Sequence, residues 1–159
     1  MTSMQMMTAL EARRRAVRLT LRLGVLMLTT GAQAQEAEAT LREVMEAFGL
    51  SGGDAIVTSS SVTVSYIAPG DAEAATAIQA VRAGRYNFGQ LAAAGVLARA
   101  IISAQAAIPA AELELDRIDA TASPYSQWLL FAVPAVQAAA ITILFGGSRL
   151  DSVHLLAGG

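Results

Sequence analysis

One apolar stretch dominates the hydropathy pattern of this chain. Residues Tyr125 to Phe145 contain no Asp, Glu, Lys or Arg, and none occurs between Asp119 and Arg149. An α-helix needs about 20 mostly apolar residues to cross a hydrocarbon core of about 30 Å. Trp128 stands near its leading end, where amphipathic rings favour the membrane interface. The pattern predicts a first transmembrane helix within residues 123–147. The alternative is a buried helix of a soluble protein, although such helices are usually shorter.

An amphipathic helix is predicted near the N-terminus, after a frayed start at Met1 to Thr8. Its apolar face is made by residues at helical spacing: Val17, Leu21, Val25 and Leu28. A neighbouring face carries arginines every four residues: Arg14, Arg18 and Arg22. A secretory signal peptide cleaved after Ala34 is the alternative. Because Arg18 and Arg22 interrupt the apolar core that such a peptide needs, we prefer the helix, ending at Gly31.

A second helix is predicted from Gln35 to Phe48, closed by Gly49. Its apolar residues share one face at i, i+3, i+4 and i+7: Leu41, Val44, Met45 and Phe48. The short connection between the two helices indicates an antiparallel pair. The period then changes, because Asp54–Thr58 and Ser61–Ile67 are β-branched and alternate, which predicts a hairpin. Residues Thr76–Arg82 are a candidate third strand.

Two further helices are predicted before the apolar stretch. Asn87 and Gln90 have capping-box spacing ahead of a helix from Phe88 to Gln105, which Pro109 ends. The apolar contacts expected from this helix are Leu91, Val96, Ile101 and Ile102. A short acidic helix is predicted from Ala110 to Ile118. The pattern as a whole predicts an α+β fold: a helical pair, a small β-hairpin or sheet and further helices, followed by an α-helical transmembrane segment.

Charge and hydropathy divide the chain into unequal parts. The mean hydropathy is +0.48, and twelve of the thirteen acidic and ten of the eleven basic residues precede position 120. We therefore expect an α+β domain over residues 1–122 and the first transmembrane helix over residues 123–147. We expect this domain to be cytoplasmic, because its export would need a signal and Arg18 and Arg22 interrupt the only candidate. An apolar element begins near Leu150 and stops after few residues. Residues 148–159 are accordingly interpreted as the start of a truncated second membrane element.

Catalytic and cofactor motifs are absent from the sequence. A net charge of −2 gives no case for nucleic-acid binding, and the lack of cysteine excludes disulfides and thiolate metal sites. His154 is the only histidine and lies in the membrane-side tail, so it is a poor candidate for a catalytic triad. The alternating Glu112, Glu114 and Asp116 are interpreted as a solvated acidic face. We expect no enzyme, cofactor or metal site.

Two glutamines are the candidate functional groups inside the apolar stretch. Gln127 and Gln137 have the largest hydrogen-bonding capacity there. Such groups pair membrane helices or line a substrate pathway, and helix pairing is the more common role.

Short stretches with a defined order and spacing run through the chain from about residue 16. They are Leu21–Gly24 through Gly31-Ala32, Glu38–Arg42, Phe48–Leu50, Ile56–Thr58, Tyr86–Leu91, Ser123–Tyr125 with Trp128-Leu129, and Leu144–Gly147. Together they resemble the threonine/serine exporter family of bacterial membrane proteins. This sequence departs from the family pattern at Gln33, where an acidic residue is usual, and at Ser59, where proline is frequent.

The resemblance implies the N-terminal part of an inner-membrane secondary exporter of threonine, serine or related small metabolites, inactive alone. It implies a lipid bilayer, a remaining membrane half or partner subunit, and a possible homo-oligomer as partners. Glu38 and Thr58 match family positions and are candidates for substrate contact or, more often, for structural roles. A membrane-anchored interaction or regulatory domain without transport activity is the alternative function.

Overall fold

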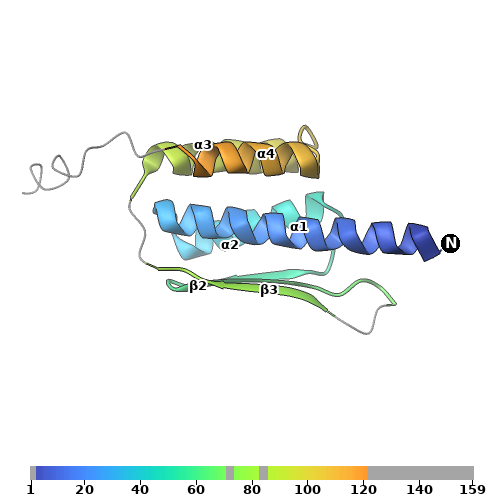
Figure 1. The fold of residues 1–159 in the computed structure, drawn as a ribbon. Helices are drawn as coiled ribbons and strands as arrows, with labels where there is room; N and C mark the ends of the chain where they lie inside the picture. Colours follow the sequence, from blue (N-terminus) through green and yellow to red (C-terminus); the bar gives the residue numbers. More distant parts are fainter. Residues whose placement is uncertain (1–2, 71–73, 83–85, 122–159) are drawn as a thin grey trace, which may run out of the picture. The chain divides into compact units, whose positions relative to one another are not determined.

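The computed structural model describes residues 3–70, 74–82 and 86–121 as a layered α+β arrangement (Figure 1). Its elements in chain order are α1 (Ser3–Thr30), α2 (Ala34–Ala47), β1 (Asp54–Val57), β2 (Ser61–Tyr66), β3 (Ala75–Ala80), α3 (Phe88–Ile102) and α4 (Ile108–Asp119). The sheet forms one layer, α1 and α2 cover one of its faces, and α3 and α4 lie beyond them (Figure 1). The central helix α1 therefore has packed neighbours on two opposite sides.

The sheet is antiparallel, in the order β1-β2-β3. Val62 of β2 pairs with Val57 on one side and with Gln79 on the other. Alternate β2 residues, Val62, Val64 and Tyr66, are buried under the helices, whereas the residues between them are only partly covered. The predicted hairpin is confirmed, and the candidate third strand forms as β3. β3 covers little core, which explains why its alternation is weak in the sequence.

Helix α1 is buried over more of its circumference than the sequence indicates. Val17 and Leu21 are buried, as predicted, but so are Leu19, Leu23 and Leu26. A helix that is apolar on several sides is one that packs on several sides, and α1 contacts the sheet as well as α2, α3 and α4. The prediction of a frayed start is wrong, because the helix already begins at Ser3.

Helix α2 follows the prediction closely. It spans Ala34–Ala47, and Leu41, Val44 and Met45 are buried as expected, with Phe48 half-buried. Both glycines that were expected to end the first two helices adopt the left-handed conformation that favours glycine at helix ends, with φ of +114° at Gly31 and +72° at Gly49.

Helix α3 is capped by Asn87, as predicted, but its core residues differ from the prediction. Val96 is 59% exposed and Ile102 is 37% exposed, so both were wrong as core contacts. Half of the buried positions are small, since they are Ala94, Leu97, Ala98 and Ile101. The helix ends at Ile102, earlier than expected, and Pro109 lies in the first turn of α4, where the missing N–H costs nothing.

The predicted transmembrane helix, residues 123–147, and the predicted second membrane element, residues 148–159, lie outside the described residues. Within the described ranges, no helix combines the length and apolarity needed to cross a membrane. The membrane segment therefore remains a prediction from the sequence.

Candidate functional site

Glu38, one of the sequence-predicted candidates, joins α2 to the edge of the sheet. Its Oε2 accepts a hydrogen bond from the backbone N–H of Val57 at 3.2 Å, and its Oε1 lies 3.0 Å from Nη2 of Arg42. Arg42 also lies 3.2 Å from Oδ1 of Asp54, at the other end of β1. Because β1 is an edge strand, its outward N–H groups need partners outside the sheet. Glu38 supplies one and holds β1 against α2.

Thr58 closes the hairpin turn that follows β1. Its Oγ1 accepts hydrogen bonds from the backbone N–H groups of Ser61 at 3.0 Å and Ser60 at 3.3 Å, and lies 2.9 Å from the Ser61 hydroxyl. Thr58 directly follows Val57, whose backbone N–H donates to Glu38. The structure therefore brings the candidate residues Glu38 and Thr58 close together. Both side chains are engaged in bonds that shape the domain. The other two candidates, Gln127 and Gln137, lie outside the described residues.

A groove of about 380 Å³ lies between α2 and α3, at a place that the sequence reasoning missed. Its lining residues are Met27, Glu36, Thr40, Glu43, Leu91, Ala92, Gly95, Val96, Ala98, Arg99 and Ile102. The α2 residues among them recur at spacings of four and three, beside the apolar face that packs into the core. The spacing of the α2 residues is visible in the sequence, but only the fold shows that α3 forms the other side of the groove.

The groove carries charges of both signs over a partly apolar lining. Glu36 and Glu43 are exposed on α2, and Arg99 is exposed on α3. Within the described part of the chain, no ion pair joins Arg99 to either glutamate. A guanidinium binds a carboxylate through two parallel hydrogen bonds, and carboxylates accept hydrogen bonds from an ammonium group. The groove therefore presents partners for both ends of a zwitterion.

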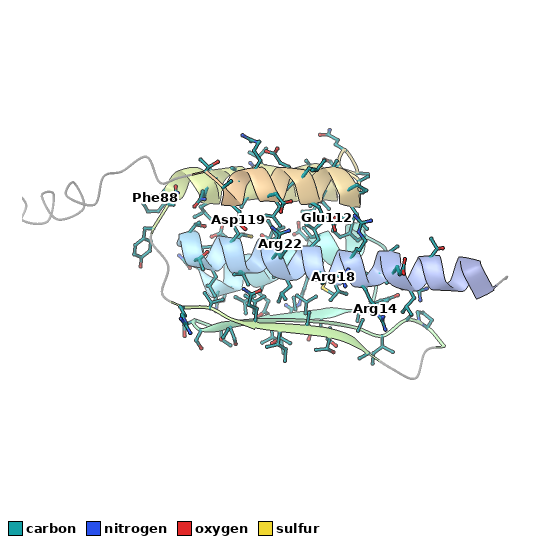
Figure 2. All side chains as sticks on the ribbon, viewed as in Figure 1. Arg14, Arg18, Arg22, Phe88, Glu112 and Asp119 are labelled. Carbon is teal, nitrogen blue, oxygen red and sulfur yellow. The ribbon has the colours of Figure 1, made fainter. Side chains whose placement is uncertain are left out.

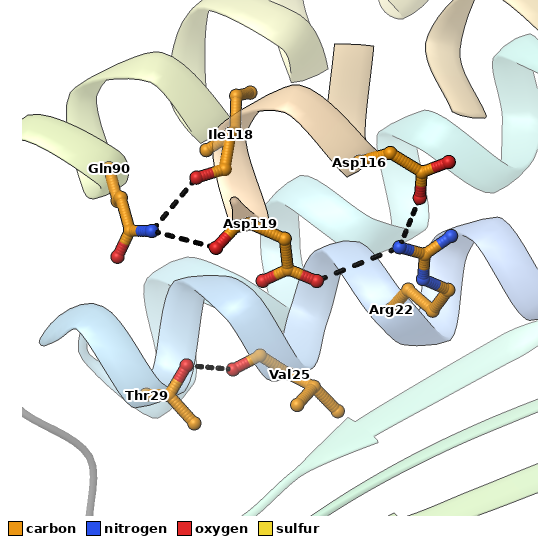
Figure 3. A network of polar contacts seen from close by, with 7 residues as sticks. All are labelled: Arg22, Val25, Thr29, Gln90, Asp116, Ile118 and Asp119. Atoms are coloured by element: carbon orange, nitrogen blue, oxygen red, sulfur yellow. Dashed lines mark hydrogen bonds and ion pairs between the residues drawn. The ribbon is translucent and has the colours of Figure 1, made fainter. Parts of the chain in front are cut away.

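Helices α1 and α4 are joined by ion pairs between residues far apart in the sequence. Arg15 binds Glu112. Nη2 of Arg22 lies 2.7 Å from Asp116 and 3.6 Å from Asp119 (Figures 2 and 3). The hydrogen bond from Arg15 is the main reason that the pKa of Glu112 is lowered, and the bond to Asp116 raises the pKa of Arg22. The expectation of a solvated acidic face holds for Asp116, whose side chain is 60% exposed although it pairs with Arg22. The Glu112 side chain is only 29% exposed and is partly covered by its pair with Arg15.

The remaining acidic residue of that helix, Glu114, pairs with Arg117 one turn later, and this hydrogen bond lowers the pKa of Glu114. Among the described residues, no group of three or more His, Cys, Asp or Glu side chains is placed to hold a metal ion.

Comparison with known proteins gives a consistent result. Residues 18–159 match the family model described as "Putative threonine/serine exporter". A Mycobacterium tuberculosis protein named "Probable threonine/serine exporter" is 29% identical over 140 residues, which are 88% of this chain and 26% of that protein. The chain thus spans about a quarter of that relative's length. No solved structure matches. The family model covers most of the chain, and the chain belongs to the threonine/serine exporter family.

Proposed function

We propose that this chain is the N-terminal part of a bacterial inner-membrane secondary exporter of small amino acids, threonine and serine above all, or of related small metabolites. The observation that carries the proposal is the family match over residues 18–159, which includes most of the described domain and the uncharged stretch from Tyr125 to Phe145. The M. tuberculosis relative is named for the same substrates, threonine and serine.

In this proposal the described domain lies in the cytoplasm, and Tyr125–Phe145 is the first membrane crossing. The flanking Arg117 and Arg149 balance each other, so charge does not decide the orientation. The support comes from α1: cleavage after Ala34 would remove a helix that packs on the sheet and on three other helices. A segment so deeply built into the core is poorly suited to be a discarded export signal.

Residues 1–159 alone should not transport. A single membrane helix satisfies its backbone hydrogen bonds internally and is surrounded by lipid, so it cannot enclose a polar path. Secondary transporters place their substrate sites between helices of paired repeats. The proposal therefore requires further membrane helices, from a remaining half or a partner subunit, and self-association through Gln127 and Gln137 would not replace them.

The α2–α3 groove is a place in the described domain that offers partners for such a substrate. Arg99 offers the bidentate geometry that a carboxylate prefers, and Glu36 and Glu43 offer acceptors for an ammonium group. Thr40 adds a hydroxyl to the lining, though its Oγ1 already donates to the Glu36 carbonyl at 2.9 Å. We assign the groove a contact with the free amino acid on the cytoplasmic side.

The test is amino-acid efflux from cells that lack their own exporters. Residues 1–159 alone should give the background rate, whereas a chimera carrying residues 18–159 in place of the matching segment of the M. tuberculosis relative should export threonine. Ala135→Arg is the control, because arginine near the centre of a span costs about 2.5–3.5 kcal/mol on insertion scales. That variant should lose export together with membrane integration.

Two outcomes would contradict the proposal. Threonine efflux from vesicles that contain only residues 1–159 would refute the need for further helices. A chimera that reaches the membrane, folds and remains inert would favour the alternative, a membrane-anchored interaction or regulatory domain.

A further inference from the structure

We propose that Tyr86 and Phe88 form an aromatic contact with the lipid headgroup interface and seat the domain on the membrane; the inference rests on the proposed membrane span. The Tyr86 side chain is 72% exposed and that of Phe88 is 66% exposed. Their rings stack with centroids 6.3 Å apart and planes inclined by 22°. Together the two rings form one contiguous exposed aromatic surface, and contiguous apolar surface is what interaction sites use.

The pair is exposed although its backbone is firmly held. Asn87, between the two rings, is only 3% exposed. Its backbone N–H donates to the carbonyl of Thr30 at 3.1 Å, and its side chain accepts a hydrogen bond from the Gln90 N–H at 3.2 Å. The Tyr86 ring lies over Gly31, where an added Cβ would be 2.7 Å from its Cδ1 atom. The two rings therefore project from the segment that leads into α3, and contacts with the end of α1 hold this segment in place.

The pair lies at the end of the domain from which the chain continues toward the predicted span. The amide nitrogen of Gln90 donates to the carbonyl oxygens of Ile118 at 2.8 Å and Thr121 at 2.9 Å, which ties the start of α3 to the last described residue. Phe88 lies at this same end (Figure 2). The beginning of α3 and the end of the described chain are therefore neighbours.

The length of the connection places this end near the bilayer. Tyr125, the first residue of the predicted span, is four residues beyond Thr121. An extended chain covers at most about 3.6 Å per residue, so the connection reaches about 14 Å. If the span begins at Tyr125, Thr121 is held within that distance of the interface, and the bond from Gln90 places the start of α3 beside Thr121. Tyrosine and tryptophan are enriched at membrane interfaces, and phenylalanine contributes apolar area to segments that lie in the interface.

Another exposed apolar group in the described domain serves as a comparison. Ile78 is 68% exposed on the outer face of the sheet, the layer on the opposite side of α1 from α3 and α4 (Figure 1). It is aliphatic, and it lies on β3 opposite Thr63 of β2. The proposal predicts lipid contact for Phe88 and none for Ile78.

The experiment uses the full chain reconstituted in phosphatidylcholine vesicles, with bromine attached to the lipid close to the headgroup as a fluorescence quencher. Trp128 is the only tryptophan, so the wild-type emission reports on the predicted span. In a Trp128→Phe background, Phe88→Trp and Tyr86→Trp report on the aromatic pair, and Ile78→Trp is the matched control. Circular dichroism checks that each variant is folded, and two reporters ensure that one remains interpretable.

We expect bromolipid to reduce the emission of Trp128 and of a tryptophan at 86 or 88, and to leave that at 78 unchanged. Quenching of Trp128 with none at 86 and 88 would overturn this inference and leave the proposed span intact. Equal quenching at 78 and 88 would overturn it as well, because contact would not be specific to this end. A blue-shifted emission from tryptophan at position 88 that bromolipid does not quench would show that other protein residues cover this position, and would also overturn the inference. An unquenched Trp128 would instead refute the span itself.

Discussion

Replacing Gly24 by alanine tests how closely α1 is packed. An added Cβ would lie 2.6 Å from Cδ1 of Leu41 on α2 and 3.0 Å from Cγ1 of Val62 on β2. Both neighbours are fully buried. A leucine end can rotate only where space exists, and valine is stiff at χ1. The close approach of helix and sheet at this point therefore depends on the absence of a side chain.

A glycine-to-alanine substitution at Gly95 provides the reference for the change in the free energy of unfolding at Gly24. Alanine in place of glycine inside a helix stabilises by about 0.5–1 kcal/mol, because it reduces the freedom of the unfolded chain. Overpacking a filled core costs about 1–3 kcal/mol. At Gly24 both effects act, and we expect a net loss of about 1 kcal/mol. At Gly95 on α3 the nearest atom to an added Cβ is Nη1 of Arg99 at 3.5 Å, an ordinary contact, so only the gain applies.

Urea unfolding of the detergent-solubilised chain, followed by far-ultraviolet circular dichroism, measures both variants. Gly24→Ala should lower the midpoint and Gly95→Ala should raise it, with unchanged slopes. In the double variant Gly24→Ala with Leu41→Val, the loss should be smaller than the sum of the single losses, since the shorter side chain removes the clash. A Gly24→Ala protein as stable as Gly95→Ala would refute the packing argument.

Three further predictions follow from the same structure. Gln33 is the N-cap of α2 without a side-chain cap bond, so Gln33→Asp should raise stability by about 0.5–1 kcal/mol in urea unfolding; an unchanged midpoint would contradict it. The hydrogen bond from Arg15 lowers the pKa of Glu112 in the folded protein. The ionised Glu112 carboxylate therefore stabilises the fold at pH values above its pKa in the unfolded chain, and this stabilisation is lost as the pH falls through the lower pKa of the folded state. Glu112→Gln should therefore be less stable than wild type at pH 7, with a difference that shrinks toward pH 3; a constant difference would be inconsistent with this linkage. Arg99→Gln should abolish the heat of threonine binding measured by titration calorimetry, whereas the control Arg117→Gln on α4 should leave it intact. Equal heats for the two variants would show that threonine does not bind in the groove.

The sequence predicts those elements best whose apolar residues follow one period. Helix α2 and strand β2 each bury a single face, so counting at spacings of 3.6 or 2 finds their limits and their buried residues. In α3 the same reasoning selected large side chains such as Val96, which is exposed. The helix instead turns Ala94 and Ala98 toward the core. Small residues let helices approach closely, and a hydropathy count gives them little weight.

The groove and the ion pairs could not be predicted in the same way, because each needs the pairing of two distant helices. A signal was nevertheless present. Arg15 and Arg22 are seven residues apart on α1, and Glu112 and Asp119 are seven residues apart on α4. Seven residues are about two helical turns, so each pair lies on one side of its helix.

Arg15 meets Glu112 and Arg22 meets Asp119 at the same offset, which requires α1 and α4 to run parallel with their charges in phase. A discarded signal peptide would have no reason to match a helix some 97 positions later. This matched spacing supports, independently of burial, the proposal that α1 is retained and not cleaved as a signal peptide.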